Sequence, residues 1–161
     1  MNEETSRASK AKPNTRLSLL DAALRMLDGG KSFDGLSLRE LTREVGIVPT
    51  AFYRHFRDMD ELGVALVDES FRMLRAMIRS ARAQSVPAKD VIVHSVETLV
   101  RQIRENRLHF RFIARERHGG VEVIRQGIRN ELRLFISELA TDLSRFPFLN
   151  TWSTEDLQMM A

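Results

Sequence analysis

Hydrophobic residues recur every three or four positions along most of this 161-residue chain. That spacing places them on one face of a helix, because an α-helix completes a turn in 3.6 residues. The first run covers residues 15–28 and stops at Gly29 and Gly30, and glycines commonly end helices. The pattern therefore predicts an all-α fold whose first helix spans residues 15–28.

A pair of short helices is predicted next. Ser37 stands where a helix N-cap belongs, and Glu40 follows three residues later, which is the capping-box spacing. This helix covers residues 38–45 and ends at Gly46, and a third helix covers residues 49–56. Two short helices around one tight turn have the geometry of a helix-turn-helix, whose second helix lies in the major groove of DNA.

The outward face of this helix-turn-helix carries groups that suit DNA. Arginine offers paired donors that match guanine, and threonine or tyrosine hydroxyls can bond phosphate. Proline and threonine carbons can contact the methyl group of thymine. On this pattern alone, a packed three-helix domain with no DNA-binding role stays an alternative. The side chains that the inward apolar stripes leave free are Arg39, Arg43, Pro49, Thr50, Tyr53, Arg54 and His55.

Helical periodicity continues through the rest of the chain. It breaks at residues 85–87 and again at residues 146–153, where prolines interrupt the pattern. The predicted helices cover residues 58–82, residues 91–106, a short aromatic segment that ends before Gly119 and Gly120, residues 121–145, and a segment that begins at Ser153.

Charge divides the chain into two parts. Residues 1–57 contain ten Lys or Arg and seven Asp or Glu, whereas residues 58–161 contain fifteen of each class, so the first part supplies the net charge of +3. A basic surface suits a polyanion such as DNA. We expect a flexible basic arm over residues 1–14, a DNA-binding domain over residues 15–57 and a helical regulatory domain over residues 58–161.

Composition excludes several classes of protein. The chain has no cysteine, so it has no disulfide framework and no thiolate metal site, and it fits a reducing cytoplasm. It has no run of the roughly 20 apolar residues that span a membrane. The sequence lacks a Gly-rich phosphate loop, a His-Glu-x-x-His helix and a nucleophile elbow. With His94, His109 and His118 in separate elements, we expect neither an enzyme nor a metal or cofactor site.

Residues 36–47, together with the run Phe-Tyr-Arg-His-Phe that ends at Phe56, resemble the DNA-binding signature of the TetR family. The resemblance covers residues 15–66 and implies a three-helix DNA-binding head in a homodimer that binds double-stranded operator DNA. It departs from the family at Met59, where a lysine usually holds a phosphate. The resemblance implies phosphate contacts at Ser37, Tyr53 and His55, and base-edge contacts at Arg39, Thr50 and Arg54 with Pro49 beside them.

Residues 52–63, 67–70 and 115–117 are similar to the FabR/DesT type of repressor within this family. That likeness implies control of unsaturated fatty-acid synthesis by a long-chain acyl-CoA or acyl carrier protein thioester. Members usually carry two further long helices for dimerisation, so we expect a regulatory domain that is incomplete at its C-terminal end. The candidate effector-binding residues are Met73, Met77, Phe110, Ile113, Arg115, Arg117 and Phe135, with Phe112, Leu139 and His118 as further candidates.

Other interpretations stay open. The apolar candidates can be plain core, and Arg115 and Arg117 can pair with neighbouring acids. The segment over residues 115–120 can also act as a relay between the regulatory domain and the DNA-binding domain. The effector can be an unrelated hydrophobic small molecule. The rival from another class is a helical protein-interaction module whose basic part binds an acidic partner or a membrane surface.

Overall fold

The computed structural model describes residues 14–82, 91–144 and 152–160, and all regular structure in these ranges is helical. This confirms the predicted all-α fold. Of the arm predicted over residues 1–14, only Asn14 lies within the described residues, where it caps the first helix. The elements are α1 (Thr15–Asp28), the 3-10 turn η1 (Phe33–Gly35), α2 (Leu38–Val45), α3 (Pro49–Phe52), α4 (Met59–Arg82), α5 (Val91–Glu105), α6 (Arg107–Glu116), α7 (Glu122–Leu143) and α8 (Thr154–Met160).

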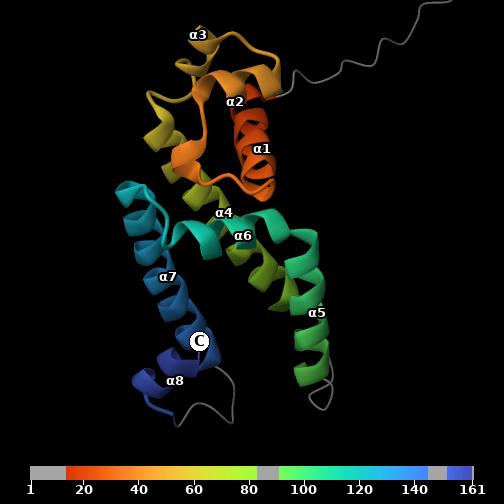
Figure 1. The fold of residues 1–161 in the computed structure, drawn as a ribbon. Coiled ribbons are helices and arrows are strands. Elements are labelled where there is room, and N and C mark those ends of the chain that lie inside the picture. Colours follow the sequence, from red (N-terminus) through yellow and green to blue (C-terminus); the bar gives the residue numbers. More distant parts are fainter. Residues whose placement is uncertain (1–13, 83–90, 145–151, 161) are drawn as a thin grey trace, which may run out of the picture.

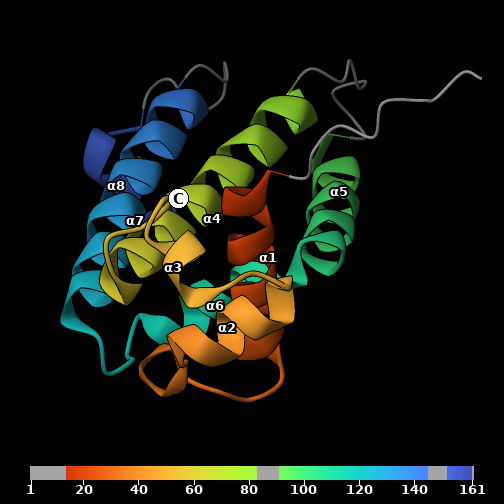
Figure 2. The same ribbon diagram turned by 90° about the horizontal axis from the view of Figure 1, so that it is seen from above.

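The helices form two groups, which Figure 1 shows end to end. We call α1–α3 the head and α4–α8 the body. The long helix α4 leaves the head and runs through the body beside α7, and α6 crosses beneath the end of α1. Seen from above in Figure 2, α5 lies on one side of α4, and α7 with α8 lies on the other.

One hydrophobic core connects the two groups. It contains Leu20 and Phe52 of the head together with Leu66, Phe112 and Ile124 of the body, all at most 3% exposed. Burying one such side chain contributes roughly 1.5–3 kcal/mol relative to leaving it in water. The head and the body therefore share their packing instead of resting on each other through a polar surface.

The body helices α4 and α7 approach closely because Gly63 has no side chain. A Cβ atom at position 63 would lie 2.8 Å from Cγ1 of Ile124 and 3.0 Å from the ring of Phe33. Farther along, Arg75 of α4 bridges two carboxylates of α7, with distances of 2.8 Å to Glu131 and 2.9 Å to Glu138. Packing at one end and ion pairs at the other hold the two long helices together.

One predicted helix end is wrong by four residues, and the other predicted ends agree with the structure within two residues. The third helix ends at Phe52 and not at Phe56, because residues 53–55 tighten into a turn in which the N–H groups of His55 and Phe56 both donate to the carbonyl of Phe52. The predicted helix over residues 121–145 is α7, which begins at Glu122 and ends at Leu143. Between α1 and α2, residues 33–35 form the 3-10 turn η1.

Candidate functional site

The start of α2 is built as the sequence predicts, with one difference. Ser37 Oγ accepts a hydrogen bond from the Glu40 N–H at 3.3 Å, which is the N-cap half of a capping box. The carboxylate of Glu40 instead accepts from Lys31 Nζ at 3.0 Å, and this pair lowers the pKa of Glu40. The cap therefore forms, while the reciprocal half of the box is replaced by a surface ion pair.

Gly46 makes the turn between α2 and α3. Its φ of 75° is left-handed, a conformation that glycine adopts at little cost. The turn is closed by hydrogen bonds from the Gly46 N–H to Arg43 O at 3.1 Å and from the Ile47 N–H to Thr42 O at 2.9 Å. This is a Schellman-type ending, and it redirects the chain so that α3 follows within three residues.

The short helix α3 is held by the aromatic residues that flank it. Phe52 and Phe56 are buried with their ring centroids 5.6 Å apart, and the guanidinium of Arg16 lies 5.1 Å from the centre of the Phe56 ring. The ring of Tyr53 meets that of Phe52 edge-on at 5.6 Å and is 60% exposed. With the phenylalanines inside, the polar side chains of this segment have only the outer surface available.

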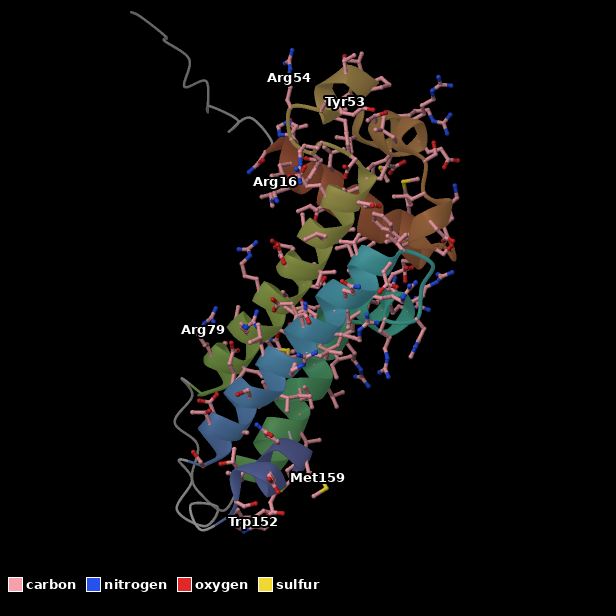
Figure 3. All side chains as sticks on the ribbon, turned by 90° about the vertical axis from the view of Figure 1, so that its left-hand side faces the viewer. Arg16, Tyr53, Arg54, Arg79, Trp152 and Met159 are labelled. Carbon is pink, nitrogen blue, oxygen red and sulfur yellow. The ribbon has the colours of Figure 1, made fainter. Side chains whose placement is uncertain are left out.

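The predicted DNA-binding residues gather on that outer surface. His55 is half-buried, and the other six are exposed. Figure 3 shows Tyr53 and Arg54 projecting from the end of the head, at the opposite end of the molecule from Trp152. Hydrogen bonds and ion pairs within the described residues engage none of the side chains of Arg39, Thr50 and Arg54, so these donors are available to a ligand.

At the start of α4, Met59 stands where the TetR family usually has a lysine, and its neighbours form the helix cap and an ion pair. Asp58 caps the helix, since its Oδ1 accepts from the Glu61 N–H at 2.8 Å. Arg57, the neighbouring cation, pairs with the Glu61 carboxylate at 3.0 Å while its side chain stays 86% exposed. A phosphate at this position would meet an arginine that already has a carboxylate partner.

The predicted effector-binding residues are divided among several places. Met77 and Ile113 are buried in the shared core, and Met73, Phe110 and Phe135 pack against it. Of these five, Phe135 lines a hollow of about 300 Å³ between α4 and α7. Its other lining residues are Ile78, Leu139 and Thr141, the cations Arg75 and Arg79, and the acids Glu138 and Asp142. Of the apolar candidates, the structure thus brings Phe135 and Leu139 to this hollow and leaves Met77 and Ile113 in the core.

The two predicted effector arginines lie near the head. Arg115 donates to the carbonyl of Leu27 at 3.3 Å and to that of Gly30 at 2.5 Å, so it binds the end of α1. Arg117 is exposed and follows the end of α6. Both stand apart from the α4/α7 hollow, and Arg115 instead ties the body to the head.

The sequence did not predict the polar contacts between α6 of the body and the end of α1 in the head. Arg107 and Arg111 of α6 both reach Asp28 of α1, at 3.0 Å and 2.5 Å. Glu116, also on α6, is 1% exposed, and its Oε1 accepts a hydrogen bond from the Phe33 N–H at 3.1 Å. The four-residue spacing of Arg107, Arg111 and Arg115 marks one helix face, but that spacing does not reveal which partner the face meets.

The described residues contain no cluster of three His, Cys, Asp or Glu side chains that could hold a metal ion. The side chain of His94 lies outside the described residues, and His109 and His118 are on α6 and in the turn after it. Among the helices described, none is both long and apolar enough to cross a membrane.

Comparison with known structures shows the fold. FadR from Bacillus subtilis, solved in complex with stearoyl-CoA, is 11% identical with a TM-score of 0.68, over 89% of this chain and 79% of that one. FadR from Bacillus halodurans, a fatty acid degradation regulator, is 12% identical with a TM-score of 0.69, over 94% and 80% of the two chains. The multidrug binding protein EbrR, solved with imidazole, is 17% identical with a TM-score of 0.58, over 92% and 93%.

A family comparison identifies the head. Residues 19–66 match the model described as bacterial regulatory proteins, tetR family. This range contains the capped helix α2, the left-handed turn at Gly46, and α3 with its exposed polar face. Residues 19–66 are therefore similar to the N-terminal domain of the tetR family, and the molecule has the fold of the two FadR structures.

Proposed function

We propose that this chain is a cytoplasmic, one-component transcriptional repressor that binds double-stranded operator DNA as a homodimer. The observation that supports this most directly is the unengaged polar face of the helix-turn-helix. Within the part of the chain that the structure describes, Arg39 and Arg54 have no hydrogen-bond or ion-pair partner, and the buried phenylalanines hold α3 behind them. A rigid helix that displays free donors is the arrangement that base recognition needs.

The roles divide according to chemistry. Arg39, Thr50 and Arg54 read base edges in the major groove, with Pro49 against a thymine methyl group. Ser37, Tyr53 and His55 bind phosphates and fix the register of the head on the duplex. In a dimer the two heads enter successive major grooves on one side of the DNA, about one helical turn apart.

For the effector we propose a long-chain acyl-CoA or acyl carrier protein thioester, in control of unsaturated fatty-acid synthesis. The hollow between α4 and α7 supports this, since Phe135 and Leu139 offer an apolar wall and Arg79 offers a cation to a phosphate or carboxylate. The B. subtilis FadR, which shares the fold, was solved with stearoyl-CoA. The second candidate is an unrelated hydrophobic small molecule, since EbrR, with a similar fold, is a multidrug binding protein.

The test is fluorescence anisotropy with the DNA upstream of the protein's own gene, against scrambled DNA, across a range of salt concentrations. Arg54→Ala is compared with Arg133→Ala, which removes an exposed arginine of α7 in the body. Selective binding that Arg54→Ala weakens and Arg133→Ala preserves supports the repressor. Equal binding of both DNAs, with equal losses in both variants, overturns it and favours the protein-interaction module.

The effector is tested in the same assay with saturated and unsaturated acyl-CoA. We expect the two acyl chains to shift operator affinity differently, and Arg79→Ala together with Leu139→Trp to reduce that response without changing binding of DNA alone. Selective DNA binding that ignores acyl-CoA and responds to another hydrophobic compound keeps the repressor and replaces the effector.

A further inference from the structure

The head–body junction consists of residues 27–35 from the head and residues 107–120 from the body. Its innermost polar contact is the hydrogen bond from the Phe33 N–H to Glu116 Oε1, at 3.1 Å. This bond joins residues that are 83 positions apart in the sequence, and Glu116 is 1% exposed. A carboxylate in this position connects η1, at the base of the DNA-binding head, to the end of α6.

A contribution to folding stability does not explain why a glutamate occupies position 116. Its Oε2 atom is buried and has no hydrogen-bond partner among the residues that the structure describes, and burial raises the pKa of this carboxyl group. A buried carboxyl group with one unsatisfied oxygen costs folding free energy, and an apolar side chain of similar size would avoid that cost. The groups that bear on its charge are the Phe33 N–H, the guanidinium of Arg115 on its own helix and the opposing carboxylate of Asp34 on η1.

The turn after α6 is shaped around this carboxyl group. A Cβ atom at Gly119 would overlap Glu116 Oε2, and a Cβ atom at Gly120 would lie 2.8 Å from Asp34 Oδ2. Arg125 of α7 donates to the carbonyls of both glycines, at 2.5 Å and 2.9 Å. The turn is therefore held against η1, and it connects the start of α7 to the Glu116–Phe33 bond.

Beside this bond the packing of α1 against α6 is incomplete. A hollow of about 420 Å³ lies between the two helices, lined by Leu24, Leu27, Leu108 and Phe112 with the junction residues. At this place polar contacts therefore add directional restraints to the apolar packing of α6 against α1. The other contacts are exposed ion pairs, in which Arg107 and Arg111 have side chains 61% and 63% exposed, and solvent weakens such pairs.

We propose that Glu116 is a positioning residue, whose buried hydrogen bond to the Phe33 N–H sets the orientation of the DNA-binding head relative to the body. Its consequence for DNA rests on the proposed function, because two heads in a dimer must match the spacing of two half-sites. Loss of the bond leaves each head folded but variable in angle.

The first measurement needs no DNA. The chain has no cysteine, so cysteines introduced at the exposed positions Arg43 and Ser137 can carry two spin labels, diluted with unlabelled protein to isolate distances within one chain. Glu116→Leu should broaden the distance distribution between head and body. Glu116→Gln keeps an oxygen acceptor and should restore the wild-type distribution, and Glu138→Gln, which alters an ion pair within the body, should leave it unchanged.

Hydrogen exchange gives a second measurement on the same bond. The Phe33 amide should exchange about tenfold faster or more in Glu116→Leu, and within about twofold of wild type in Glu116→Gln. If Glu116→Leu does not fold, the wild-type protein still provides a test, because the Phe33 amide proton resonance should follow the titration of the Glu116 carboxyl group and should not do so in Glu116→Gln. Unchanged distances and exchange, or a Phe33 resonance independent of pH, would overturn the proposal.

DNA binding then separates this proposal from the proposed function. Wild type should bind an operator with native half-site spacing about tenfold more tightly than one lengthened by one base pair, and Glu116→Leu should reduce that preference to about twofold with half-site affinity unchanged. If the wild-type protein shows no preference for operator DNA, the proposed function is refuted, while the spin-label distances still test the positioning role of Glu116. Wild-type spacing preference in Glu116→Leu refutes the positioning role alone.

Discussion

The outer face of the head and the head–body junction contain the same kinds of side chain in opposite circumstances. On the outer face, Arg39 and Arg54 are exposed, and hydrogen bonds and ion pairs within the described residues do not engage them. At the junction, Arg115 is bound to two backbone carbonyls, and Asp28 accepts from two arginines. The difference teaches that surroundings, and not residue type, separate an arginine that is available to a ligand from a structural one.

The largest expected effect separates the two regions by stability. Phe33→Ala at the junction removes a side chain that is 2% exposed and should lower the free energy of unfolding by about 3–5 kcal/mol. Tyr53→Ala on the outer face should lower it by less than about 0.5 kcal/mol, because that ring is 60% exposed. Urea denaturation followed by circular dichroism measures both, and similar losses would show that the contrast is wrong.

The next effect separates the regions by DNA affinity. Arg54→Ala should cost about 1–3 kcal/mol of operator binding and relax specificity at one base pair. Arg111→Ala, which removes a junction arginine of similar exposure, should leave base preference unaltered because that side chain is paired with Asp28. Anisotropy on a set of single-base operator variants distinguishes the two, and altered base preference in Arg111→Ala would contradict the assignment.

A smaller effect concerns the pH dependence of stability and the pair formed by Ser70 of α4 and His109 of α6. Ser70 Oγ lies 2.9 Å from His109 Nδ1, and burial lowers the pKa of His109 despite the nearby acids Glu69 and Asp21. The folded state favours the neutral form of His109. Its contribution to the free energy of unfolding should therefore be fully present above a pH of about 6.5, and it should decrease as the pH falls from there toward the lowered pKa of the folded state. His109→Gln should flatten this part of the stability curve, with His118→Gln, an exposed histidine, as the control.

The smallest effect concerns the surface ion pairs of the junction. Asp28→Asn removes the shared partner of Arg107 and Arg111 and should cost about 0.2–1 kcal/mol, less at high salt. Thermal melts at low and high salt give the measurement. A decrease in the free energy of unfolding of several kcal/mol that does not depend on salt would contradict this. It would mean that the ion pairs are shielded from solvent more than the exposed fractions of Arg107 and Arg111 indicate.

Much of the fold could be predicted from the sequence because its signals are local. The cap at Ser37, the left-handed turn at Gly46 and the proline that begins α3 each act within a few residues, and the structure has all three. The predicted end of the third helix at Phe56 was wrong because the apolar spacing of Phe52 and Phe56 is equally compatible with a helix and with a tight turn.

The outward face of the head could likewise be predicted, since the side chains opposite an apolar stripe must face solvent. The junction could not, because its contacts join residues about 80 positions apart and no local pattern specifies the partner. Arg115 was expected to be either an effector ligand or a partner of a neighbouring acid, and the structure places it on the carbonyls of α1. The DNA contacts and the effector site stay predictions that the binding experiments test.

The core shared by α1, α4, α6 and α7 has a consequence for how this protein can evolve and be handled. A head cut away at the start of α4 would lose the apolar side chains with which the body completes the shared core, so these three helices are not a portable unit that can be moved to another body. Heat or denaturant should melt both groups in a single cooperative transition. The head and the body of this chain should therefore be inherited as one unit.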